Sequence, residues 1–141
     1  MIKQDIYLYN WDWKVRVYYA IDNYDINTIL KDLDDIGCST RDMQETQQLL
    51  LYGGDNVGIT YTSNADRKTI TVIGITSSAD EFQNTFDHEK GHIAMHIARA
   101  LNIDPFSEQY QYLTGDIGIK LFAVAKHFLC DKCRKRIKYL S

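Results

Sequence analysis

The five residues His88-Glu89-Lys90-Gly91-His92 constrain the fold of this chain more than any other segment. Positions i and i+4 lie on one face of an α-helix, so two imidazoles at this spacing can reach one metal ion when the segment is helical. Glu89 then lies beside the same ion. The sequence therefore predicts a helix here, with Zn²⁺ held by His88 and His92.

The H-E-x-x-H spacing is typical of zinc peptidases, in which the glutamate is the general base and therefore the catalytic residue, here Glu89. Ser78 and Glu81 form a sequence capping box that can begin the helix. His96 adds one turn to the histidine stripe. It lies about 12 Å along the axis from His88, too far for both to bind one ion, so we expect it beside the site.

A catalytic zinc ion usually takes three protein ligands. Glu108 is our first candidate for the third, because it lies sixteen residues after His92 in the first turn of the next predicted helix. The competing interpretation is that Glu108 only favours the positive end of that helix. Asp116, two turns further, is a weaker alternative ligand.

Four further residues have two interpretations each. Asp87 could accept a hydrogen bond from a ligand histidine and so orient its ring, or it could be a solvated acid. Tyr110 and Tyr112 could donate to an oxyanion in hydrolysis, although tyrosines at helical spacing mostly pack. Gly91 could let another backbone approach the metal helix, or serve helix packing alone.

Hydrophobic periodicity predicts one α+β domain over residues 1–141, of type ββααββαα, with a sheet of about four strands packed on helices. Asp25 and Ser39 are expected to cap the first two helices, and Gly53-Gly54 to end the second. Asp104-Pro105 is expected to open the last helix, which then runs through Phe128 into the basic tail. The expected strands are 6–9, 13–19, 58–63 and 69–75.

Composition and charge exclude few functional classes of protein. The net charge of −3 gives no global support for nucleic-acid binding, and no apolar run is long enough to span a bilayer. Charge is uneven: residues 21–55 carry eight acids against two bases, and residues 120–141 carry seven bases against one acid. We interpret the basic tail as a solvated helix end.

The absence of a signal-peptide pattern and the three cysteines predict a reducing cytoplasm.

A weaker metal pattern is His127-x-x-Cys130-x-x-Cys133, with Cys38 as a possible fourth ligand. These spacings could build a structural zinc site. On the continuous helix predicted here, however, the three side chains drift around the axis, so we expect reduced thiols. A redox role for Cys130 and Cys133 lacks the βαβ context expected of that chemistry.

The stretch Asn84–Gly118, about a quarter of the chain, resembles the short zincin-like proteins encoded in bacteriophages and prophages. The matching segments are Thr85–His92 and Glu108–Gly115. The resemblance implies a minimal gluzincin-type metallopeptidase domain, an active-site helix followed by a helix bearing the ligand Glu108, and a small mixed sheet whose edge pairs with an extended peptide. Residues 69–75 are expected near that edge. Gln111 and Tyr112 depart from the Asp or Asn that larger regulatory metallopeptidases often carry there.

Our leading hypothesis is a cytoplasmic, phage-associated zinc metallopeptidase that acts on a peptide or protein substrate. The alternative is a non-catalytic, zinc-containing structural or assembly protein of a bacteriophage, associated with the virion. A third hypothesis, nucleic-acid binding through the basic tail, predicts a steep salt dependence.

Overall fold

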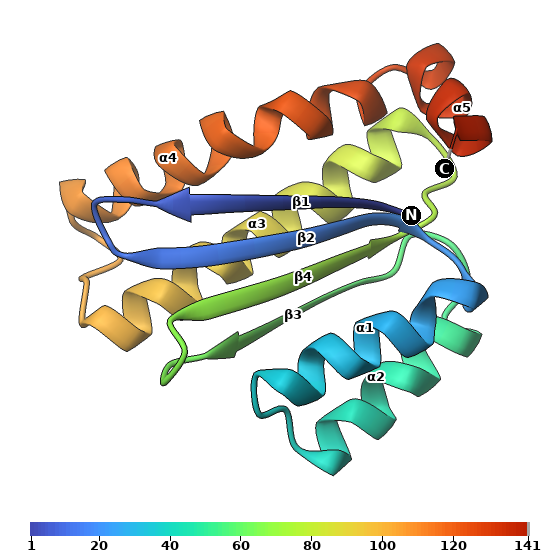
Figure 1. Cartoon of the computed structure of the whole chain (residues 1–141). Coiled ribbons are helices and arrows are strands. Elements are labelled where there is room, and N and C mark those ends of the chain that lie inside the picture. Colours follow the sequence, from blue (N-terminus) through green and yellow to red (C-terminus); the bar gives the residue numbers. More distant parts are fainter. Residues whose placement is uncertain (141) are drawn as a thin grey trace.

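Four strands form one mixed sheet, with helices on both of its faces (Figure 1). The computed structural model describes residues 1–140, with side chains as far as Ile137. Its elements, in chain order, are β1 Ile2–Leu8, β2 Trp13–Ile21, η1 Asn23–Asp25, α1 Ile26–Asp35, α2 Thr40–Tyr52, β3 Gly58–Ser63, β4 Lys68–Gly74, α3 Ala79–Leu101, α4 Glu108–Ala125, η2 Lys126–Phe128 and α5 Asp131–Leu140. The predicted α+β class and four-stranded sheet are confirmed.

The strand order is β1-β2-β4-β3. Both predicted hairpins are present, β1 with β2 and β3 with β4, and β2 joins β4 in parallel. Because β2 takes the free side of β4, the latter is an inner strand and six of its seven residues are buried. Residues 69–75, expected near the sheet edge, lie one strand inside it, and β3 is the edge strand.

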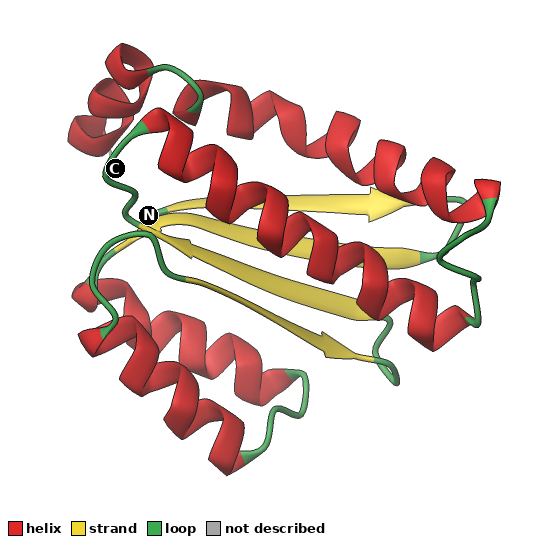
Figure 2. Ribbon diagram, turned by 180° about the vertical axis from the view of Figure 1, so that it is seen from behind, coloured by secondary structure: helices red, strands yellow, loops and turns green. Residues whose placement is uncertain are grey.

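Side chains alternate between two cores, as the period of a strand requires. In β2, Val15, Val17 and Tyr19 pack against α3 and α4, whereas Tyr18 packs against the α1–α2 hairpin. Figure 2 shows α3 crossing one face of the sheet. The α1–α2 hairpin packs against the opposite face, on side chains of β2 and β4.

The α1–α2 hairpin is held by local polar contacts. The Oγ of Ser39 accepts a hydrogen bond from the Asp42 amide at 3.1 Å, as predicted, and Gly53 ends α2. The Asp25 side chain does not cap α1. It accepts instead from the Asp22 amide, in a capping box one turn earlier.

The helix that carries the histidines is the longest in the described residues. Ser78 caps it by accepting from the Glu81 amide at 3.3 Å, and Asn102 ends it in the left-handed region at φ 55°. One face is buried in the core. The histidine stripe lies beside that face.

Two expectations for the C-terminal third are wrong. The α4 helix begins at Glu108 with Ser107 as its cap, because Asp104 forms a turn by accepting from the Phe106 amide. The helix also ends at Ala125. The chain turns there and buries Phe128, whose ring stacks on Tyr19 and Phe82 at centroid distances of 5.3 and 4.8 Å.

Within residues 1–140, no helix has the length and apolar character needed to cross a membrane.

Candidate metal centre

His88 and His92 point at the same position. They lie one turn apart on α3, both are exposed, and their Nε2 atoms are 3.1 Å apart. Two nitrogens bound at about 2.0–2.1 Å to one tetrahedral zinc ion lie roughly 3.3 Å apart. The donor pair therefore fits zinc without rearrangement of the helix.

Glu89 lies on the inner side of the same turn, with only 4% of its surface exposed. A carboxylate oxygen and the two imidazole nitrogens all lie within 4.8 Å of one another. In the described part of the chain, these three residues are the one cluster of three or more His, Cys, Asp and Glu side chains with metal-ligand spacing. The predicted pairing of the histidines with Glu89 is thus present in the fold.

A threonine pair from the sheet holds Glu89. The Thr60 hydroxyl donates to Glu89 Oε2 at 2.8 Å, and the Oγ1 atoms of Thr60 and Thr71 are 2.9 Å apart. Since the single hydroxyl proton of Thr60 goes to Glu89, Thr71 donates to Thr60. This chain of donors fixes the position of the Glu89 carboxyl group.

A second threonine pair, one step along the hairpin, holds His96. Thr62 Oγ1 lies 3.0 Å from His96 Nδ1 and 2.8 Å from Thr69 Oγ1, which accepts from the Trp13 indole at 3.0 Å. Burial, and then the neighbouring charges of His92 and Arg99, lower the pKa of His96. His96 is therefore a fixed, half-buried residue beside the histidine pair.

Gly58 on β3 gives Glu89 the space it occupies. A Cβ at position 58 would lie 2.8 Å from Glu89 Cγ, so a side chain there would displace the carboxylate. Gly91, by contrast, has nothing within 4 Å of a Cβ position and is exposed. The expectation that Gly91 allows a close backbone approach is wrong, because the close approach occurs at Gly58.

The centre opens into a cleft of about 510 Å³ between three elements. One wall is the histidine face of α3, another is the edge strand β3, and the third is α2. The α2 residues that line the cleft are Asp42, Glu45, Thr46 and Leu49.

Glu108 lies away from this cleft. It is exposed in the first turn of α4, beyond the C-terminal end of α3, and His92 is nine residues, roughly 13 Å along the axis, from that end. The α4 helix also packs beside β1, whereas the histidines face β3, three strand spacings or about 14 Å away. Its role as the third ligand stays a prediction, and the structure does not bring it to the pair.

The other candidates also lie outside the lining of the cleft. Asp87 pairs with Lys90 at 3.3 Å, and Asp116 pairs with Lys120 at 3.2 Å on the β1 side. Tyr110 packs partly into the α3–α4 core, and Tyr112 is 67% exposed. No contact in this structure supports the functional roles predicted for these four residues.

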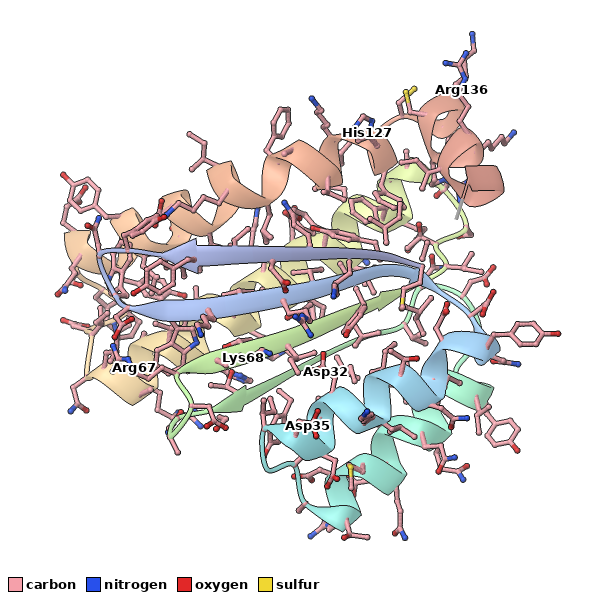
Figure 3. All side chains as sticks on the ribbon, viewed as in Figure 1. Asp32, Asp35, Arg67, Lys68, His127 and Arg136 are labelled. Atoms are coloured by element: carbon pink, nitrogen blue, oxygen red, sulfur yellow. The ribbon has the colours of Figure 1, made fainter. Side chains whose placement is uncertain are left out.

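The second metal pattern does not form a cluster. His127 and Cys130 are exposed near the junction of α4 and α5, where Figure 3 labels His127. Cys38 is buried in the other core, with α1 and α2. Together with Cys133, they do not gather three ligand atoms around one point in the described residues.

Sequence patterns missed four residues of the site: Gly58, Thr60, Asp42 and Glu45. The facing threonines of the hairpin, Thr60 opposite Thr71 and Thr62 opposite Thr69, were a sequence signal for the β3 wall of the cleft. The acidic residues of α2 gave no such signal.

Comparison with protein-family models, with curated proteins and with solved structures found no match to this chain.

Proposed function

We propose that this chain is a zinc-dependent peptidase of the zincin type, which cleaves an extended peptide lying along β3. One observation carries the proposal. A buried glutamate, fixed by Thr60, lies beside two exposed imidazoles whose nitrogens are 3.1 Å apart at an open cleft.

Each residue has one role in this proposal. Neutral His88 and His92 would hold the ion through Nε2. Zinc bound there would polarise the substrate carbonyl and lower the pKa of a water molecule. Because Thr60 occupies Oε2 of Glu89, Oε1 is the oxygen placed to accept the proton and later return it to the leaving amine.

The edge strand supplies a binding mode for the peptide. In the described part of the chain, β3 pairs on one side only, with β4. An extended peptide can add to such an edge through backbone hydrogen bonds. A peptide bound along β3 would run past Glu89, which contacts Gly58 and Thr60 of that strand.

The α2 wall of the cleft carries candidates for the third metal ligand. Asp42 and Glu45 line the same cleft as the histidines, and Glu108 does not. We therefore favour a carboxylate of α2 over Glu108 as the group that completes the site when zinc is bound. Zinc affinity should fall at least about tenfold in Glu45→Gln or Asp42→Asn and stay unchanged in Glu108→Gln. The reverse result would restore Glu108 as the ligand.

The central experiment separates metal binding from hydrolysis. Full-length protein is stripped with a chelator, titrated with zinc, and incubated with a peptide library read by mass spectrometry. We expect one zinc per chain, lost in the His88→Ala/His92→Ala double variant. Glu89→Gln should keep zinc and lose cleavage, while Asp87→Asn, an outward carboxylate two residues earlier, should keep both.

An open cleft favours catalysis over the alternative of a non-catalytic phage structural or assembly protein. Structural zinc sites are usually closed by four protein ligands, whereas the two imidazoles here are exposed. Stoichiometric zinc without cleavage of any library peptide would favour the structural alternative. A folded protein that binds no zinc would overturn both.

A further inference from the structure

The turn between η2 and α5 places two cysteines at the start of a helix. The Cys130 carbonyl accepts from the Arg134 amide at 2.9 Å, the first bond of the helix, so Cys130 is the N-cap and Cys133 the third helical residue. An N-cap side chain faces the amides of the second and third helical residues. The continuous helix expected from the sequence would not have this arrangement.

The pKa of the first thiol, Cys130, is lowered by its position at the helix start. The amide of Cys133, then that of Lys132, and then the Cys133 thiol donate to the Cys130 sulfur and lower the pKa of Cys130, against smaller opposing effects of burial and of Asp131. The thiolate is the form of cysteine that attacks disulfides. Cys130 is exposed and Cys133 is partly buried, so a molecule in solution meets Cys130 first.

The turn that carries the pair is anchored to the rest of the molecule. Asp131 Oδ1 accepts from the Ala79 amide at 2.9 Å, and the Arg134 guanidinium donates to the carbonyls of Thr76 and Ser77. These contacts fix the first turn of α5 against the β4–α3 connection. The two cysteines are therefore held at a set spacing.

We propose that Cys130 and Cys133 form a reversible dithiol–disulfide couple that exchanges with a low-molecular-weight disulfide of the glutathione type. The Cys130 thiolate attacks one sulfur of that disulfide and expels the other as a thiolate, which leaves a mixed disulfide on Cys130. Cys133 gives its proton to solvent and attacks the Cys130 sulfur, which expels the second thiolate. The pair loses two electrons, and the external disulfide is reduced to two thiols.

Geometry and charge both support this exchange. Cα atoms three residues apart in a helix lie roughly 5 Å apart, within the usual 4.4–6.8 Å range of disulfides. Four exposed basic residues flank the turn in the chain, Lys126, Lys132, Lys135 and Arg136. Figure 3 shows Arg136 on α5 at this end of the molecule. A basic surface attracts an anionic disulfide such as oxidised glutathione. The couple does not depend on the proposed zinc chemistry.

The test equilibrates full-length protein in mixtures of reduced and oxidised glutathione. The thiols are then trapped by alkylation, and the peptides are read by mass spectrometry. We expect one two-electron transition that links Cys130 to Cys133 and leaves the buried Cys38 reduced. Cys133→Ser should stop at the mixed disulfide on Cys130, and Cys130→Ser should react at least about tenfold more slowly. Cys38→Ser, the matched control, should keep the wild-type transition.

Three results would overturn the proposal. These are separate glutathionylation of both cysteines in the wild type, no reaction in the most oxidising mixture, or equal alkylation rates of Cys130 and Cys133 in the two serine variants. Circular dichroism verifies the fold of each variant. If a variant does not fold, the wild-type titration decides alone, because it requires no substitution.

Discussion

Side chains of the sheet fix the positions of Glu89 and His96. Thr60 and Thr62 lie on the same face of β3, and each connects one residue of α3 to a threonine of β4. Substitution of either threonine by valine keeps the shape of the side chain and removes the hydroxyl. The two positions therefore form a matched pair for testing whether the Glu89 contact matters.

Thr60→Val should reduce peptide cleavage about ten- to a hundredfold, because a hydrogen bond to a charged group contributes about 1.5–3 kcal/mol. Zinc affinity should not change, since Thr60 does not contact a histidine. Thr62→Val should have a much smaller effect on cleavage. Steady-state kinetics and zinc titration of both variants provide the comparison, and equal losses in the two would contradict a specific role for Thr60.

Gly58 and Gly91 should respond in opposite ways to alanine. A Cβ at Gly58 displaces Glu89, so Gly58→Ala should lose cleavage while it keeps zinc. A Cβ at Gly91 meets open space in the middle of α3, so Gly91→Ala should raise the free energy of unfolding by about 0.5–1 kcal/mol and keep cleavage. Gly115→Ala, equally open on α4, is the stability control. Loss of zinc in Gly91→Ala would instead assign that glycine to the metal site.

A polar cluster joins β1, β2 and α1. Arg16 pairs with Asp5 at 2.7 Å and with Asp32 at 3.1 Å, and the Tyr18 hydroxyl donates to Asp32 at 2.6 Å. Burial, and then the bond to Asp32, raise the pKa of Tyr18 to about 12 from its ordinary 10.0. The α1–α2 hairpin, one wall of the cleft, is held to the sheet in part by this cluster.

The fold should therefore lose stability at alkaline pH. Because the folded pKa of Tyr18 is the higher one, its contribution is complete below pH 10 and is lost as the pH rises through about 12. Between these values the unfolding free energy should fall on the order of 2 kcal/mol further in the wild type than in Tyr18→Phe. Urea titrations across this range measure the difference. Tyr24→Phe, at a residue that is 94% exposed, should behave as the wild type.

The metal centre lies on a helix that the rest of the molecule already holds. Ser78, Asn102 and a buried apolar face fix α3 by contacts that involve no ion. Removal of metal by a chelator should therefore leave the circular dichroism spectrum unchanged. Zinc at about 100 times its Kd should then add about 2.7 kcal/mol to the unfolding free energy, and this gain should vanish in His88→Ala. Unfolding on chelation would indicate a structural ion.

Local sequence patterns were sufficient for much of this molecule. The period of two in β2, the caps at Ser39 and Ser78, and the i, i+4 spacing of His88 and His92 all act within a few residues, and each produced the expected structure. These features depend on backbone geometry and on neighbours in the chain. For the same reason, the motif alone predicts the clustering of both histidines with Glu89.

The remaining features depend on contacts between distant segments. The parallel pairing of β2 with β4 makes β3 the edge strand and places Thr60 under Glu89, and no local pattern encodes that choice of partner. Packing of Phe128 on Tyr19 interrupts the last helix and so brings Cys130 to the start of α5. Residue spacing thus determined the histidine pair and its glutamate. Long-range packing, in which burial decides among locally equivalent arrangements, selected the walls of the cleft and separated Glu108 from it.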